Sequence, residues 1–97
     1  MFEGNKPRYL TRGVDAEISP EIQVFLWAAI DKMPGPKDYL QVFKLSAVNG
    51  LQVIDHTSEQ PAFHMTYLLA TAERPVTAKV YVIDSDEYCT MLLASEY

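Results

Sequence analysis

The sequence predicts an α+β domain, in which one amphipathic helix packs on one face of a mostly antiparallel sheet of five to six strands, in the order β-α-β-β-β-β-β. Three observations lead to this prediction. Residues 19–36 have the pattern of one complete helix with both ends marked. Residues 39–56 contain two strand-like runs on either side of an Asn-Gly turn signal. Residues 75–83 alternate apolar and polar side chains as a half-buried strand does.

The length and composition of the chain favour one domain, residues 1–97. It is 48% hydrophobic, which is enough for a core at this size without disulfide bonds. A lone cysteine, Cys89, excludes an internal disulfide framework and is typical of a reducing cytosol. Residues 1–6 lack the apolar core of a signal peptide, and no apolar run reaches the roughly 20 residues that span a bilayer. We therefore expect a cytoplasmic protein without a membrane segment.

The predicted helix has a start, a stop and an apolar stripe. Ser19 is a preferred N-cap, Pro20 suits the first helical position, and Glu21 complements the positive end of the helix dipole. The Pro-Gly-Pro run at residues 34–36 ends the helix. Its apolar residues recur at the spacing of one face: Ile22, Phe25, Leu26, Ala29, Ile30 and Met33. A helix with such a stripe needs a sheet to pack against.

The remaining segments are expected to be strands. Asn49 and Gly50 form the strongest short-range hairpin signal, because both central positions of a type I′ turn need a positive φ. Residues 88–93 fit either a strand or a helical face, and the hairpin-sized turn before them favours a strand. The strands are expected within residues 8–14, 39–45, 51–56, 64–69, 75–83 and 88–93.

The charge of the chain is acidic, with thirteen acidic residues against eight basic ones and a net charge of −5. Residues 15–97 carry this excess, whereas residues 1–14 are locally basic. An acidic body disfavours contact with a phosphate backbone, so we expect no direct DNA binding. It suits a basic or nucleic-acid-binding protein partner. The alternative interpretation is that the charge only keeps the protein in solution.

The residues that carry chemistry are sparse. A metal site needs His, Cys, Asp or Glu at converging spacing, which Asp55, His56, His64 and Cys89 do not provide. A lone cysteine in an apolar strand is usually an inert core residue, and neither histidine has an obvious orienting partner. We therefore predict no metal, no cofactor and no enzymatic activity. An enzyme whose site combines Cys89 with a histidine is the third hypothesis.

Acidic and aromatic residues are the candidate contacts for a partner. Trp27 either flanks the core or anchors an interface. Tyr81 lies on the outward face of its predicted strand, where a partly apolar sheet face could dock a protein or a second copy of the chain. A turn rich in Asp is also ordinary turn chemistry. The acidic candidates lie in the turn after the strand 75–83 and at the start of the helix: Asp84, Asp86, Glu87, Asp15, Glu17 and Glu21.

Residues 9–14, 23–27, 38–43 and 75–84 carry a resemblance that extends over nearly the whole chain. In these segments the sequence resembles a small uncharacterised family, a domain of unknown function, of Gram-positive bacteria and their mobile elements. The resemblance supplies no catalytic residues. It implies a setting of chromosomes, phages and conjugative elements, in which short acidic proteins include anti-CRISPR inhibitors that block a nucleic-acid-handling effector or its guide RNA.

The sequence therefore predicts a non-catalytic acidic protein that binds a protein partner. In its most concrete form, this protein is a mobile-element inhibitor that covers a basic nucleic-acid channel of its target. The alternative is a structural or regulatory domain of the bacterial cytosol that associates with itself through its sheet, as a homodimer.

Overall fold

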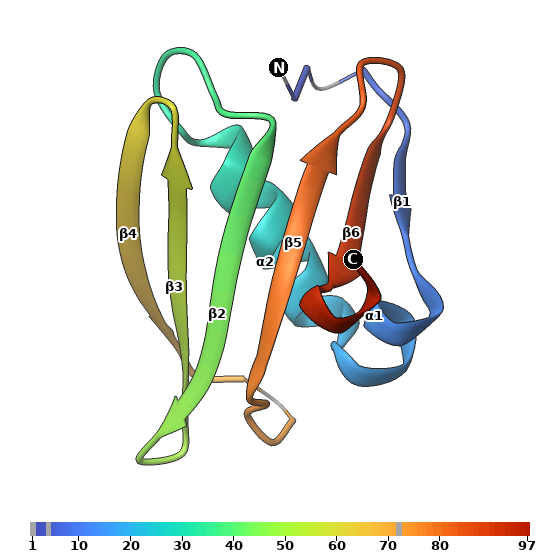
Figure 1. Ribbon diagram of the computed structural model, residues 1–97. Coiled ribbons are helices and arrows are strands. Elements are labelled where there is room, and N and C mark those ends of the chain that lie inside the picture. The colour runs from blue at the N-terminus through green and yellow to red at the C-terminus, as the bar shows by residue number, and fades with distance from the viewer. Residues whose placement is uncertain (1, 4, 72) are drawn as a thin grey trace.

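The computed structural model describes residues 2–3, 5–71 and 73–97, which fold into one six-stranded mixed sheet and two α-helices (Figure 1). The fold class is therefore α+β. Neither helix among these residues combines the length and the apolar composition that crossing a bilayer requires. The elements are β1 (Arg8–Leu10), α1 (Arg12–Glu17), α2 (Pro20–Asp31), β2 (Leu40–Val48), β3 (Leu51–Glu59), β4 (Ala62–Leu69), β5 (Ala78–Asp84), β6 (Cys89–Leu93) and the 3₁₀ turn η1 (Ala94–Glu96).

The sheet has the strand order β1-β6-β5-β2-β3-β4. β1 runs parallel to β6, and all other neighbouring strands are antiparallel. Figure 1 shows α2 behind the sheet, crossing its central strands, with β4 and β1 at the two edges. We call the side of the sheet that is turned away from α2 the open face.

The expected helix at residues 19–36 is present as α2. The Ser19 hydroxyl accepts a hydrogen bond from the backbone N–H of Ile22 at 3.4 Å, and Pro20 occupies the first turn. The predicted stripe is buried except at one position. Phe25 is only partly buried, and its ring meets the edge of Tyr67 with centroids 5.1 Å apart. The buried members of the stripe are Ile22, Leu26, Ala29, Ile30 and Met33.

The strand expected over residues 8–14 is wrong beyond Leu10, because α1 begins at Arg12. Thr11 is the N-cap of this helix, and its hydroxyl accepts from the Val14 N–H at 3.3 Å. The Glu96 carboxylate accepts from the Thr11 hydroxyl at 2.6 Å and from the Gly13 N–H at 3.3 Å. A Cβ at Gly13 would lie 2.7 Å from that carboxylate, so a larger residue there would displace the end of the Glu96 side chain. The start of α1 is thus held by Glu96, which lies at the far end of the sequence.

The other strands agree with the sequence pattern but differ at their ends. Asn49 and Gly50 have φ of 51° and 79°, as a type I′ turn requires. Residues 57–59, which lie outside the expected strands, extend β3 to Glu59, and Glu59 pairs with Ala62 at the start of β4. The Asp38 carboxylate holds this turn, because it accepts from the N–H groups of Glu59 and Gln60 at 3.2 Å and 2.9 Å.

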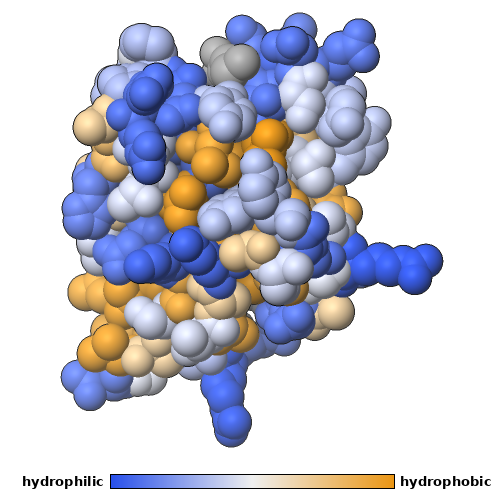
Figure 2. All heavy atoms as spheres, viewed as in Figure 1, coloured by the Kyte–Doolittle hydropathy of each residue, from blue (hydrophilic) through white to orange (hydrophobic). Residues whose placement is uncertain are grey.

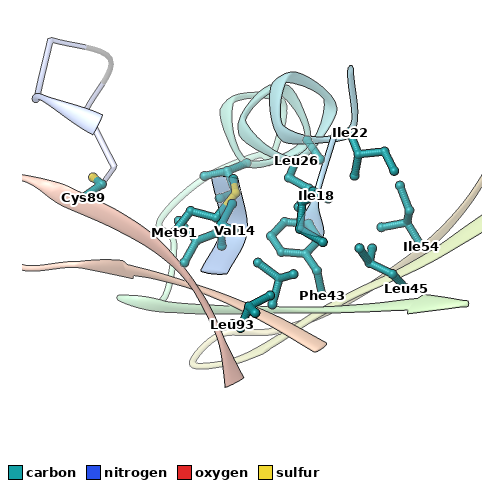
Figure 3. Packing of buried hydrophobic residues seen from close by; sticks show 14 of the residues in the cluster. Val14, Ile18, Ile22, Leu26, Phe43, Leu45, Ile54, Cys89, Met91 and Leu93 are labelled. Carbon is teal, nitrogen blue, oxygen red and sulfur yellow. The ribbon is translucent and has the colours of Figure 1, made fainter. Parts of the chain in front are cut away.

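The core lies between the helices and the covered face of the sheet. Figure 3 shows Val14, Ile18, Ile22 and Leu26 of the helical segment above side chains of the sheet, with Cys89 at the margin of the cluster. Cross-strand neighbours continue the core along the sheet, since residues directly opposite each other share a face. The sheet contributes Phe43, Leu45, Ile54, Val80, Val82, Cys89, Met91 and Leu93.

We expect three consecutive positions of α2 to differ sharply in their contribution to stability. Leu26 is fully buried, Phe25 is partly buried, and Val24 is 67% exposed. Leu26→Ala should lower the free energy of unfolding by about 2–5 kcal/mol, whereas Val24→Ala should change it by less than about 0.5 kcal/mol. Phe25→Ala should fall between them. Urea unfolding measures all three, and equal losses at positions 24 and 26 would contradict the orientation of α2.

Candidate protein-interaction surface

A polar row crosses the middle of the open face. Lys79 on β5, Lys44 on β2, Asp55 on β3 and Thr66 on β4 lie opposite one another in the register. The Thr66 hydroxyl donates to the Asp55 carboxylate at 2.6 Å. That hydrogen bond, with the neighbouring His64 and Lys44, lowers the pKa of Asp55. Because opposed like charges destabilise a sheet, the Lys79–Lys44 pair is a cost that Asp55 partly offsets.

An aromatic row lies next to the polar row. Tyr81 on β5 is opposite Leu92 on β6 and Val42 on β2. The ring of Tyr97 meets that of Tyr81 edge to face, with centroids 5.4 Å apart, and the Lys79 ammonium lies 5.6 Å from the Tyr81 ring centre. Tyr81 therefore lies on the outward face, as the sequence predicted, but is partly covered by Tyr97.

Exposed apolar side chains gather at the hairpin end of the open face. Val48 is 52% exposed, Leu51 36% and Leu68 66%, and Val53 lies beside Leu68 in the register. Figure 2 shows hydrophobic surface over the lower parts of β2 to β4, below a hydrophilic band that crosses the sheet. A gathering of exposed apolar residues with a polar border is typical of a protein interaction site.

A surface hollow of about 490 Å³ lies at the other end of the open face. Its lining includes Tyr39, Leu40, Val42 and Thr57, and Tyr39 is 49% exposed. Asp38 holds the wall in place through backbone N–H groups. Burial alone would raise the pKa of Asp38, but these hydrogen bonds outweigh it and lower the pKa. The hollow is thus a shaped feature of the open face.

The acidic turn after β5 does not present Asp84 to solvent, so the predicted contact there is wrong for this residue. Asp84 is 4% exposed and accepts from the Phe2 N–H at 2.6 Å, the Lys6 ammonium at 2.8 Å and the Asp86 N–H at 3.1 Å. Burial alone would raise the pKa of Asp84, but Lys6 and the N–H donors outweigh it and lower the pKa. Of the three acidic residues in this turn, only Asp86 and Glu87 are exposed.

The predicted acidic contacts do not form one surface. Asp15, Glu17 and Glu21 are exposed around α1 and the start of α2, whereas Asp86 and Glu87 lie in the turn before β6. Figure 1 shows α1 at one end of β6 and that turn at the other. A strand of five residues spans about 16 Å, so the length of β6 separates the two groups.

Trp27 flanks the core rather than the open face. The side chain is partly buried against the core cluster, and the Arg8 guanidinium lies 4.8 Å from its ring centre. Arg8 also forms an ion pair with Asp31 on α2. This stack joins β1 to α2, so Trp27 has a structural role in the packing of these two elements.

His56 is a buried polar residue that sequence reasoning did not place. Its Nε2 is 2.6 Å from the Gln41 side-chain oxygen, and the Gln41 amide nitrogen donates to the Asp38 carbonyl. Gln41 must therefore accept from His56, which assigns the ring hydrogen to Nε2. The ring stacks on Phe43 at 4.2 Å, and burial lowers the pKa of His56 to about 4. The sequence offered one signal of a buried polar group here: polar Gln41 lies on the same strand face as apolar Phe43.

The structure does not bring Cys89 and a histidine together. Cys89 is fully buried on β6, and burial raises the pKa of its thiol. β5 and β2 separate its strand from that of His56, which is about 14 Å at the usual strand spacing. Among the described residues, no group of three His, Cys, Asp or Glu side chains is arranged to hold a metal ion.

Comparison with known proteins gives a family and a fold. The model of a family described as staphylococcal protein of unknown function (DUF960) matches residues 7–96. The chain is also similar to the crystal structure of a protein of unknown function from Enterococcus faecalis, with a TM-score of 0.88 and 22% identity over 99% of this chain and 94% of that chain. At this identity the likeness shows the fold alone. No curated protein matches the chain.

Replacing Asp84 should make the folded protein less stable, because the change leaves the Lys6 ammonium and the Phe2 N–H without their shared acceptor. We expect Asp84→Ala to cost about 3 kcal/mol or more in the free energy of unfolding. Glu87→Ala, three residues along in the same turn, should change it by less than about 0.5 kcal/mol. Chemical denaturation compares the two, and similar stabilities would show that the Asp84 ion pair is unimportant.

His56 should make the protein less stable in mild acid. Its pKa is about 4 in the folded state against 6.5 as the ordinary value, so between these pH values the unfolded chain binds the proton more readily. Stability should therefore fall as the pH drops from 6.5 to 4, by about 3 kcal/mol in total. His56→Gln should be less stable at pH 7 but should lose the part of this pH dependence above about pH 5, where carboxylates are largely ionised in both states. A wild-type unfolding midpoint that is constant over the window would exclude a buried neutral histidine.

Proposed function

The chain belongs to this staphylococcal family of unknown function, and we propose that it is a binding module that docks a protein partner on the open face of its sheet. The observation that carries the proposal is the exposed apolar end of that face, where Val48, Leu51 and Leu68 face outward. The helices already bury the opposite face, so these side chains contribute nothing to the core. Burying them against a partner would remove apolar surface from water.

The composition of the open face favours a protein partner over a nucleic acid. Its two lysines, Lys44 and Lys79, share the polar row with Asp55, and the chain as a whole is acidic. A base-stacking platform needs free aromatic faces within a basic groove. Tyr81 instead meets Tyr97 edge to face and has the Lys79 ammonium near its ring.

The geometry of the face suits a partner that inserts a side chain. The hollow beside Tyr39 has a volume of about 490 Å³ and opens on the same face as the apolar end. Interfaces of this kind combine an apolar centre and tyrosines with few charges. The polar row would then contribute to orientation and specificity more than to affinity.

A narrower proposal, a mobile-element inhibitor that covers a basic channel, would use a different surface. Asp15 and Glu17 line a hollow of about 440 Å³ together with Glu73 and Arg74. This hollow could receive a basic segment of a partner, and it supports the anti-CRISPR-like form of the proposal better than the turn at Asp84 does. The two surfaces make different predictions about which residues touch the partner.

Site-specific photo-crosslinking separates these proposals. Leu68 on the open face and Val24 on α2 are 66% and 67% exposed, so a photoreactive residue at either position samples solvent equally. In Gram-positive cells that express the protein, we expect an adduct with a different protein from position 68 and none from position 24. A third variant at position 15 tests the acidic hollow.

The outcomes of this experiment are distinct. An adduct from position 15 without one from position 68 would overturn the open-face proposal in favour of the acidic hollow. Equal adducts from positions 24 and 68 would show only random encounter. Absence of any adduct with another protein from position 68 would also contradict the proposal.

A further inference from the structure

The two edges of the sheet are built differently. β1 is three residues long, follows Pro7 and contains Arg8. Short length, proline and charge are the devices by which proteins prevent an exposed edge from pairing with another strand. A proline, Pro61, likewise precedes β4, but β4 is eight residues long and contains no Asp, Glu, Lys or Arg. Residues 60–72 hold no Asp, Glu, Lys or Arg, the longest such stretch in the chain.

The unguarded edge is apolar on both of its sides. Met65 lies opposite His56 and so points to the helix-covered face, yet it is 45% exposed. Leu68 lies opposite Val53 on the open face and is 66% exposed. A strand added alongside β4 would cover both side chains and supply partners for the outward backbone groups of β4.

We propose that β4 pairs antiparallel with β4 of a second copy of this chain, so that two sheets join into one about a two-fold axis. In such a pair the residue at the axis lies opposite its own symmetry mate, and residues beside it lie close to theirs, so charges near the axis would repel each other. The uncharged β4 avoids this repulsion. It also gives two copies, each with a net charge of −5, a neutral place to meet.

The alternation of side chains restricts the register. Opposed residues must share a face, so the two-fold axis has to pass at a residue and not between two residues. An axis at Thr66 sets Leu68 opposite the partner's His64. An axis at Met65 sets Phe63 opposite the partner's Tyr67. Either register extends the open face across both copies, and neither depends on the partner proposed above.

The mass of the purified protein in solution tests the pairing. Sedimentation equilibrium should give twice the 11.0 kDa chain mass. Met65→Lys and Leu68→Lys should each weaken the dimer at least tenfold, because each would place two copies of a charge at the junction. Val24→Lys, at the same exposure as Leu68, should leave the dimer intact. Circular dichroism and urea unfolding should show that all three variants fold.

Cysteine crosslinking shows at which residue of β4 the two-fold axis passes. Opposed residues in an antiparallel pair have Cα atoms about 4.5–5.5 Å apart, within the range of a disulfide. Mild oxidation should crosslink Thr66→Cys or Met65→Cys to a second copy, but not Val24→Cys.

A wild-type monomer at millimolar concentration would overturn the proposal. So would a dimer that resists both lysine substitutions, or a dimer in which neither cysteine at β4 crosslinks. These measurements use the purified chain alone, so they fail or succeed independently of the crosslinks to other proteins.

Discussion

Packing of α2 against one face of the sheet determines what the rest of the molecule can do. The helix is twelve residues long and buries Leu26 and Ile30 completely over the central strands. One helix of this length covers only part of a six-stranded sheet. The cover is one-sided and reaches β4 where Phe25 packs against Tyr67. It leaves Leu68 exposed on the open face and Met65 exposed farther along the strand. The surfaces that we propose for recognition are the parts of the sheet that α2 leaves uncovered.

Three acidic side chains of this protein hold segments of its backbone together. Asp84 joins Phe2 and Lys6 to the turn after β5, Glu96 joins η1 to the start of α1, and Asp38 holds the turn between β3 and β4. Each carboxylate accepts hydrogen bonds from backbone N–H groups. The net charge of −5 is therefore a poor guide to a binding site. Part of this charge comes from carboxylates that hold turns in place.

The sequence pattern predicted those elements whose ends are set by residues close to them in the chain. The caps of α2 and the Asn49-Gly50 turn lie within a few residues of the structure that they start or stop. The helix α1 was missed although Thr11 caps it locally, because it is only six residues long and also relies on Glu96, more than eighty residues away. Asp84 was misplaced because Lys6 is equally remote. The outward position of Tyr81 was predicted from the alternation within its own strand. The exposure of Leu68 was not, because it depends on which strand forms the edge, and sequence alone does not give strand order.

Lysine reactivity in the wild-type protein tests most directly whether the open face is the recognition surface. Lys44 and Lys79 are exposed on that face, and Lys32 is exposed at the end of α2 on the other side of the molecule. A brief pulse of an acetylating reagent, read by mass spectrometry, gives the three rates in the purified protein and in its native cells. The rates at Lys44 and Lys79, relative to Lys32, should fall in cells. Unchanged ratios, or protection of Lys32 instead, would contradict recognition through the open face.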